Sequence, residues 1–336
     1  MESHRKYDVE SMIKINRTII RNWADELGTD DLILAEQDFR LVNLLKAIYS
    51  DPFLMSRLYL KGGTAINKLY LRKTPRLSVD IDFNAIGGKE QVLGERKQVR
   101  ERIEVKLKEQ DSTYKIKRKK TYELTSIRAR YIPVFGGARY LKIDISNVER
   151  FPVLKPRQIE LDGINFNTYQ LEELTATKLR ALHSRLKGRD VYDLYFISNI
   201  DMDMELLRKL VIYYFYRAGK IFNPRLFFRN IREKFSSEKY VDDVSGFVRP
   251  DIEFSIDDAV EKVLSHYSSL GRLDERDENF IALSRKLLGK SVSKNRLRII
   301  SEIKYPLSYL FGPDVVISDD AKGMGVEDIK VFIRRS

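Results

Sequence analysis

The sequence contains no cysteine and only three histidines, and these shortages exclude several kinds of site. Without cysteine the chain forms neither a disulfide nor a thiolate metal centre. The histidines, His4, His183 and His266, are too few and too scattered to suggest a zinc site. Zinc chemistry and disulfide frameworks are therefore set aside.

Long apolar runs are also missing from the sequence. A membrane-spanning helix needs about 20 predominantly apolar residues in a row, and no window of the chain approaches this. The first ten residues, MESHRKYDVE, are charged and lack the apolar core of a signal peptide. We therefore expect a cytoplasmic protein without a membrane partner.

The composition is that of an ordinary globular protein with a basic balance. The 336 residues are enough for two domains or one large one. Lysine and arginine number 61 against 49 acidic residues, which gives a net charge of +12. This charge favours an anionic partner such as nucleic acid, although many basic proteins bind none.

The most informative stretch of the sequence begins with Gly62, Gly63 and Thr64. A short apolar run precedes them, and apolar residues at helical spacing follow. Glycines at a strand-to-helix turn let the backbone approach a ligand, and the first N–H groups of a helix have no partner within it. This turn can bind phosphate, with the Thr64 hydroxyl as a further donor. An ordinary turn would carry the same residues.

A second extended run, residues 78 to 84, carries Asp80 and Asp82. Residues two apart in a strand point to the same side, so the two carboxylates share one face. Neighbouring carboxylates repel one another unless a cation lies between them. Oxygen ligands on a strand suit Mg²⁺ or Mn²⁺. The alternative is a solvated strand end.

The order and spacing of these two motifs resemble those of a known family. Gly-Gly-Thr, a helix and then SVDIDF are similar to the nucleotidyltransferase signature of the DNA-polymerase-β-like superfamily. The wording KGGTAINKLYL followed by SVDIDF specifically resembles the AbiEii/AbiGii toxin family, the enzyme half of type IV toxin–antitoxin pairs. The resemblance covers about residues 55 to 200.

The resemblance implies a role for each motif residue. Asp80 and Asp82 would hold two Mg²⁺ ions that bridge the triphosphate of a bound NTP, and the glycine turn would hold phosphate oxygens. A third carboxylate is expected on a later strand, and Asp144 lies within the apolar run ARYLKIDIS. Asp144 would bind the metal near the acceptor hydroxyl. An ordinary exposed strand residue is the alternative.

Residues 113 to 145 read as a β-meander of three extended runs that are rich in basic residues. Lys115, Lys117 and Lys119 share one face of the first run, and Arg128 and Arg130 share one face of the second. Such a surface can follow an RNA backbone. A solvent-facing antiparallel sheet would carry the same residues, so both interpretations stay open.

A later helix, LEELTATKLRALHSRL, carries Lys178 in the middle of its apolar side. Such a lysine either extends to the surface or reaches a buried anion. After Gly188, which is expected to break this helix, Asp190 and Asp193 lie close on one face of the next helix. They read either as cap and ion pairs or, by the same resemblance, as residues that complete the nucleotide site with Lys178.

The remaining elements are expected to be mainly helical. An aromatic segment, residues 211 to 235, favours a buried core over an RNA-stacking surface, and residues 151 to 170, with two prolines, read as a connector. Helices are expected at residues 8–27, 32–49, 89–110, 204–219, 224–235, 256–270, 276–289 and 293–304.

Together these observations predict an α+β protein with a nucleotidyltransferase core in a mixed sheet. The core would span residues 1–155, and a mainly helical domain, residues 156–336, would complete the nucleotide site. The predicted activity is transfer of NMP from an NTP to RNA, as the toxin of a type IV pair with an antitoxin partner. Family resemblance implies the 3′ end of tRNA as acceptor. The alternatives are transfer to a small molecule or protein hydroxyl, and a non-catalytic nucleic-acid-binding module.

Overall fold

The computed structural model describes residues 15–72, 76–235, 252, 254–289, 307–311, 315–319 and 321. The chain divides into two compact units. The first comprises Met1–Arg150, Arg157–Thr168 and Phe247–Glu253, and the second comprises Phe151–Pro156, Tyr169–Gly246 and Phe254–Ser336. Each unit therefore consists of three stretches of the chain, and the chain returns from the second unit to the first twice. Each unit is described by itself.

A seven-stranded mixed sheet forms the centre of the first unit. Its strand order is β3-β4-β5-β2-β1-β7-β6. The strands are β1 (Leu58–Lys61), β2 (Asp80–Ala85), β3 (Lys115–Lys120), β4 (Leu124–Tyr131), β5 (Arg139–Ser146), β6 (Arg157–Leu161) and β7 (Ile164–Thr168). The central strand β2 runs parallel to β5 on one side and antiparallel to β1 on the other.

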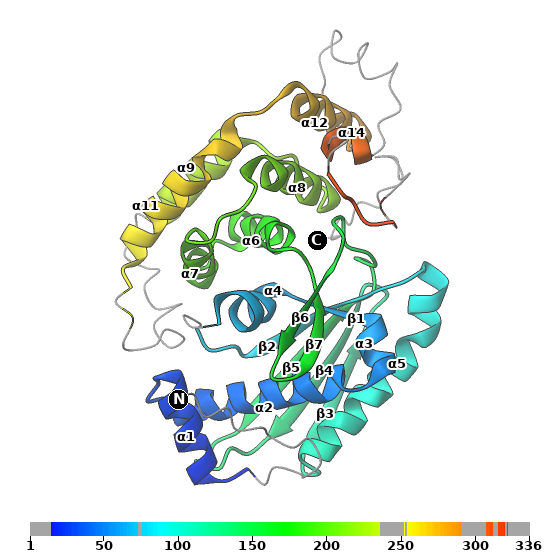
Figure 1. Cartoon of the computed structure of the whole chain (residues 1–336), viewed down its shortest axis with the longest axis vertical. Coiled ribbons are helices and arrows are strands. Elements are labelled where there is room, and N and C mark those ends of the chain that lie inside the picture. Colours follow the sequence, from blue (N-terminus) through cyan, green and yellow to red (C-terminus); the bar gives the residue numbers. More distant parts are fainter. Residues whose placement is uncertain are drawn as a thin grey trace. The chain divides into compact units, whose positions relative to one another are not determined.

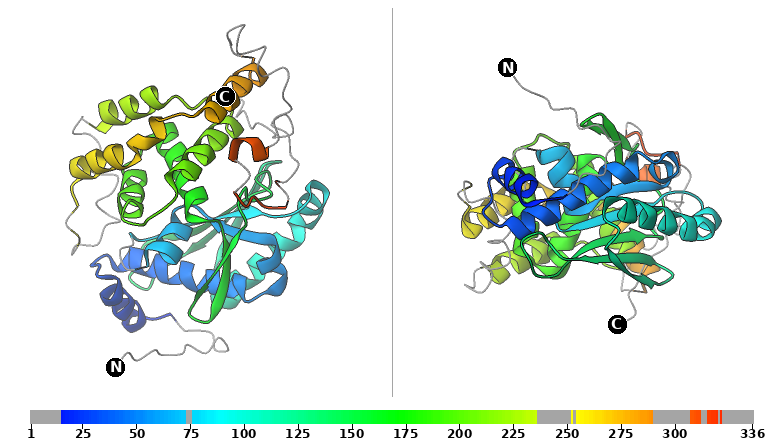
Figure 2. Two further views of the ribbon diagram at one scale, coloured as in Figure 1. Left: turned by 45° about the horizontal axis from the view of Figure 1, so that its top comes forward. Right: turned by 90° about the horizontal axis from the view of Figure 1, so that it is seen from below.

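One face of this sheet is covered by two helices, α2 (Leu32–Tyr49) and α5 (Lys89–Gln110). Figures 1 and 2 show the two helices side by side against the strands. Alternation directs Ile81, Phe83 and Ile143 to this face, and all three are buried. The opposite face therefore receives the residues between them, including Asp80, Asp82 and Asp144.

The helices predicted in the first unit are observed, although the first of them begins later than expected. Helices α2 and α5 match the expected ranges. The first predicted helix is observed as α1 (Arg17–Leu27), which begins after the Asn16 side chain accepts a bond from the amide of Ile19. Residues 8 to 14 of that prediction lie outside the described residues. A short helix, α3 (Pro52–Arg57), precedes β1.

The predicted connector at residues 151 to 170 is wrong. This segment contains the hairpin β6–β7, and β7 pairs in parallel with β1 to extend the sheet of the first unit. The Tyr49 hydroxyl donates to the carbonyl of Leu58, and a second contact joins it to the carbonyl of Asn167 at 2.9 Å. The prolines at 152 and 156 both precede the hairpin, in the short stretch Phe151–Pro156 that belongs to the second unit.

The second unit consists mainly of helices. They are α6 (Leu171–Arg185), α7 (Gly188–Ile197), α8 (Met204–Arg217), α9 (Pro224–Phe235), α11 (Ile256–His266), the 3₁₀ turn η3 (Tyr267–Gly271), α12 (Glu275–Leu287) and α14 (Leu307–Phe311). The aromatic segment is core, as predicted, since Tyr213, Phe215 and Phe227 are buried. The helix expected at 293–304 lies outside the described residues.

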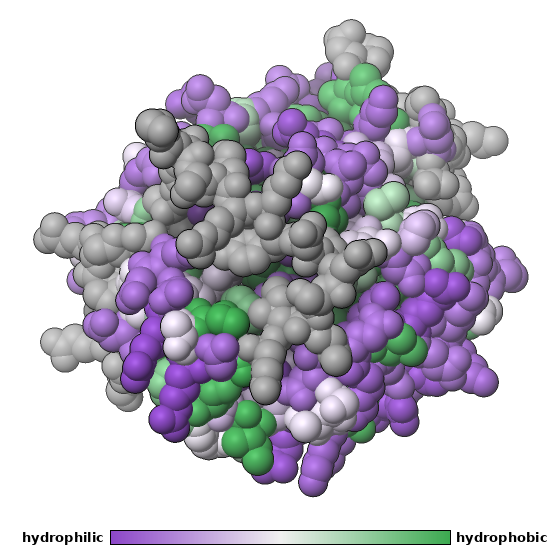
Figure 3. All heavy atoms as spheres, turned by 60° about the horizontal axis from the view of Figure 1, so that its bottom comes forward, coloured by the Kyte–Doolittle hydropathy of each residue, from purple (hydrophilic) through white to green (hydrophobic). Residues whose placement is uncertain are grey.

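The surface agrees with the charged composition. On the face shown in Figure 3, hydrophilic side chains cover most of the coloured surface, and hydrophobic side chains gather in small separate groups. Within the described residues, no helix combines the length and apolar character needed to cross a membrane.

Candidate active site

The glycine turn joins β1 to the short helix α4 (Gly62–Ala65), as predicted, and a π-helical segment, η1 (Ile66–Leu71), continues it. Gly62 has a φ of +72°, which strongly favours glycine. A Cβ atom there would lie 2.9 Å from Oδ2 of Asp82. Glycine at this position therefore lets the turn lie directly against the Asp82 carboxylate.

The Thr64 hydroxyl is used differently from the expectation. It donates to the carbonyl of Asp80 at 2.6 Å, and the side chain is buried. This bond fastens the start of α4 to the start of β2. A hydroxyl has one proton to donate, so the predicted bond to phosphate would require the bond to Asp80 to break.

The sheet brings the three predicted carboxylates together on one face. Asp80 and Asp82 lie two apart on β2, and Asp144 is the register partner of Asp82 on the adjacent parallel strand β5. Gln37 of α2 donates to the carbonyls of Val79 and Tyr140, both at 3.1 Å, and so joins the two strands near their starts. Asp82 and Asp144 are far apart in the sequence, so local sequence pattern gives no sign that they are paired.

Two lysines that sequence reasoning missed lie beside these three carboxylates and form a cluster with them. Lys142 precedes Asp144 by two residues and forms an ion pair with its Oδ2 at 2.8 Å. Lys61 is the register partner of Asp82 on β1 and pairs with Glu149 at 3.0 Å. The signal for Lys142 was the same period-two alternation that placed Asp80 beside Asp82.

The electrostatics of the cluster work against a charged Asp82. Burial raises the pKa of Asp82; Lys61 opposes the shift, while the carboxylates of Asp80 and Asp144 add to it. For Lys142, burial favours the neutral amine, but the Asp144, Asp80 and Asp82 carboxylates outweigh it and raise the pKa. The site therefore holds more negative charge than its surroundings stabilise.

The carboxylate oxygens of Asp80, Asp82 and Asp144 suit a hard divalent cation, although the three side chains are not yet arranged around a common point. Oδ1 of Asp144 is buried and has no hydrogen-bond partner, so one carboxylate oxygen is left for a ligand. Among the described residues, no three His, Cys, Asp or Glu side chains are arranged to hold a metal ion. Lys142 occupies the other oxygen of Asp144, and a bound cation would compete with it.

The predicted basic residues lie on the same face as the aspartates. Asp82, Asp144, Ser126 and Lys119 form one row across β2, β5, β4 and β3, and Asp80, Lys142, Arg128 and Lys117 form the next. A third row holds Tyr140, Arg130 and Lys115. We call this region of β3, β4 and β5 the basic face.

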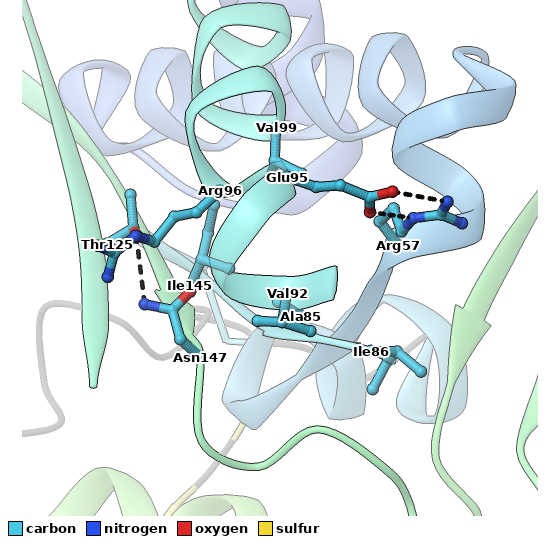
Figure 4. A pocket seen from close by; sticks show the side chains of 10 residues that line it. All are labelled: Arg57, Ala85, Ile86, Val92, Glu95, Arg96, Val99, Thr125, Ile145 and Asn147. Atoms are coloured by element: carbon cyan, nitrogen blue, oxygen red, sulfur yellow. Dashed lines mark hydrogen bonds and ion pairs between the residues drawn. The ribbon is translucent and has the colours of Figure 1, made fainter. Parts of the chain in front are cut away.

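A small pocket lies on the other face of the sheet and is separate from this cluster. Figure 4 shows it between α5 and the strands, close to the ion pair of Arg57 with Glu95. Its volume is about 10 Å³, room for about one water molecule. Ala85, Ile145 and Thr125 line it, and alternation directs them away from the aspartates. It is a packing gap and not a nucleotide site.

In the second unit, Lys178 of α6 is buried among charged partners. Its amine pairs with Asp190 at 3.0 Å and with Asp193 at 2.7 Å, and both carboxylates are fully buried. Sequence reasoning missed Arg185, which pairs with Asp190 at 2.6 Å. Burial raises the pKa of Asp190, but Lys178 and Arg185 outweigh it, and the pKa lies below its ordinary value.

The junction between these two helices differs from the prediction. Gly188 was expected to break the first helix, but α6 ends at Arg185, and Leu186 takes a left-handed conformation with a φ of 47°. Gly188 instead begins α7. This short junction allows Arg185 at the end of α6 to reach Asp190 in the first turn of α7. The lysine, the arginine and the two aspartates form the second-unit cluster.

The motifs and the fold indicate a nucleotidyltransferase, and comparison with known proteins identifies the family within that class. Residues 43–265 match the family described as the nucleotidyl transferase AbiEii toxin of type IV toxin–antitoxin systems. This match covers more than half of the chain, and the protein belongs to that family. The family prediction is confirmed, and membership implies an NTP substrate and an antitoxin partner.

A solved structure supports the fold. MenT4, a nucleotidyltransferase toxin from Mycobacterium tuberculosis, is similar with a TM-score of 0.62 and 20% sequence identity. The similarity covers 85% of this chain and 99% of that chain. At this identity the likeness shows the shared fold, which confirms the predicted α+β class. A search of curated proteins finds no match to the sequence.

Proposed function

We propose that this toxin transfers a nucleoside monophosphate from an NTP to a hydroxyl of RNA, at the 3′ end of tRNA, in the cytoplasm. The observation that carries the proposal is the register of Asp82 with Asp144, beside the turn at Gly62. Carboxylates on adjacent strands, one with a free buried oxygen, suit a reaction in which phosphate charge must be offset.

The chemistry requires one bond to form and one to break. The acceptor oxygen attacks the α-phosphorus, the bond from that phosphorus to the leaving oxygen breaks, and pyrophosphate departs. Asp80, Asp82 and Asp144 would hold two Mg²⁺ or Mn²⁺ ions, which when bound offset the triphosphate charge and favour ionisation of the hydroxyl. Asp144 would act on the acceptor side. The amides at Gly62 and Gly63 would bind phosphate oxygens.

For the second-unit cluster, the proposal gives Lys178 the role of neutralising the triphosphate. A lysine is a compact point charge that binds phosphate well. Asp190 and Asp193 would hold its amine in place, which their contacts at 3.0 and 2.7 Å support. An antitoxin from the same type IV pair would be the protein partner.

The test is incubation of the purified protein with each labelled NTP and total RNA, in Mg²⁺ or Mn²⁺. We expect label from one or more NTPs to join RNA of tRNA size, and Asp82→Asn to abolish it. Asp162→Asn, in the exposed turn between β6 and β7, is the matched control and should transfer normally. Label found only on protein or on a small hydroxyl compound would contradict the RNA acceptor.

A further inference from the structure

The basic face carries cations that the fold itself does not neutralise. Lys117 lies directly opposite Arg128, and Lys115 lies directly opposite Arg130. Side chains in such cross-strand pairs have Cβ atoms about 4.5–5.5 Å apart, and like charges there destabilise a sheet. Among the described residues, neither these four cations nor Lys119 forms an ion pair.

The other face of the same strand shows the contrast. Arg118, between Lys117 and Lys119, points to the opposite side and pairs with Glu104 of α5 at 2.6 Å. The fold thus supplies a counterion for β3 on the helix-covered face and none on the face of the aspartates. Repulsion that is left in place on one face only is explained by an anionic ligand that binds there.

We infer that the basic face binds the single-stranded 3′ end of the RNA acceptor, with phosphates over Lys117 and Arg128 and a base stacked on Tyr140. The inference rests on the proposed function, because the row from Lys117 and Arg128 runs through Lys142 to the aspartates. A chain lying along this row would bring its terminal hydroxyl to the carboxylates.

Tyr140 is the reason for expecting single-stranded rather than duplex RNA on the basic face. The residue is 44% exposed, and it lies in the row of Arg130 and Lys115. Exposed aromatic rings stack on unpaired bases, whereas a duplex keeps the faces of its bases covered. The cations of the basic face would bind the phosphate backbone of single-stranded and duplex RNA alike. Tyr140 is therefore the residue that favours single-stranded RNA.

The test measures binding of a fluorescent 12-nucleotide RNA by anisotropy, in EDTA and without NTP, over a series of salt concentrations. Each of Lys117→Gln and Arg128→Gln should weaken binding and reduce the slope of log K against log salt by about 0.7. Lys120→Gln is the control, because Lys120 is exposed on β3 but directed to the other face. Unchanged slopes in the first two variants would overturn the inference.

Tyr140 provides the second arm of the test. Tyr140→Ala should weaken single-stranded RNA binding by about 5- to 100-fold, while Tyr140→Phe retains it. Blunt duplex RNA should lose no affinity in either variant. Equal losses for single strand and duplex would overturn the stacking role. The melting temperature of Lys117→Gln should stay level or rise, which separates lost binding from lost folding.

This inference and the proposed function fail separately. Asp82→Asn should bind the RNA as well as the natural protein does, while it transfers nothing. If the natural protein transfers no nucleotide but binding follows Lys117 and Arg128, only the transferase proposal is wrong. If it transfers nucleotide to RNA and the Lys117→Gln and Arg128→Gln variants bind normally, only the present inference is wrong.

Discussion

The two units contain lysine–aspartate clusters that differ in how completely their charges are balanced. In the second-unit cluster, two cations face two fully buried carboxylates. In the first unit, three aspartates share one face, and one oxygen of Asp144 is buried without a partner. The pKa of Asp190 is lowered, whereas that of Asp82 is raised.

The second-unit cluster therefore stabilises the folded state even without a ligand, whereas the three aspartates of the first unit, the first-unit cluster, leave charge that a ligand can balance. A carboxylate with a lowered pKa is more stable charged in the fold than in water, and one with a raised pKa is less stable. The first-unit cluster thus has a preference for added positive charge that the protein does not fully meet. The predictions below test this contrast from the largest expected effect to the smallest.

Replacement of Lys178 by methionine should have the largest effect, a loss of about 3–5 kcal/mol in the free energy of unfolding. The variant leaves Asp190 and Asp193 buried without their lysine. An unpaired amine on an apolar face would have given the opposite expectation, a neutral or stabilising change. Urea denaturation measures the loss.

The control for this variant is Lys155→Met, an exposed lysine in the same unit, which should be neutral. Adding Asp193→Asn to Lys178→Met should recover part of the lost stability, because one buried charge is removed. Full stability in Lys178→Met alone would contradict the structural role of the second-unit cluster.

Replacement of Asp82 by asparagine should abolish activity but leave the stability of the fold intact. Transfer should be lost, a fall of at least about 100- to 1000-fold, since that is the range for loss of one positioned electrostatic group. The melting temperature should stay level or rise, because the charged form of Asp82 is disfavoured by its buried setting. Labelled-NTP turnover and thermal melting on one sample measure both. A large fall in stability would show that the charge of Asp82 is needed for folding.

Replacement of Gly62 by alanine should cost about 1–2 kcal/mol of stability through backbone strain. It should also reduce transfer, because the new Cβ would lie 2.9 Å from Oδ2 of Asp82. Gly137→Ala is the matched control, since Gly137 has a similar φ of +79° but open space around its Cβ position. Similar losses of transfer in both variants would rule out a specific contact with Asp82.

The pH dependence should distinguish the clusters by direction. The stabilising contribution of Asp190 is present above the ordinary pKa of 3.8 and is lost as pH falls through its lowered value. The contribution of Asp82 is fully present below 3.8 and is lost as pH rises through its raised value. Carbon-13 NMR titration of the two carboxyl groups should show Asp82 titrating last as pH rises. The reverse order would contradict the comparison.

Much of the fold and site could be predicted because it depends on local pattern. Period-two alternation placed Asp80 beside Asp82, and helical periodicity located α2 and α5. The hairpin β6–β7 was missed because its strands are only five residues long and two prolines precede them, so no alternation of useful length stands out. Its place in the sheet depends on β1, about 100 residues earlier in the chain.

Local pattern could not predict partners that are distant in the sequence, and only the family resemblance grouped Asp144 with Asp80 and Asp82. The register of Asp82 with Asp144 arises from strand order, which local pattern does not encode. Lys178 was recognised as unusual, but its partners depend on the left-handed turn at Leu186. The shared face of the aspartates and Arg128 likewise follows only from pairing.

The hairpin β6–β7 also has a consequence for the synthesis of the protein. Strand β1 is synthesised early, but its second neighbour, β7, is complete only at residue 168, after the stretch 151–156 of the second unit has been made. Until then one edge of the nascent sheet is open to pairing with other chains. A fragment that stops near residue 155 would keep β1 as an open edge and would aggregate, whereas one that continues through Thr168 would cover β1 and leave the polar strand β6 at the edge instead.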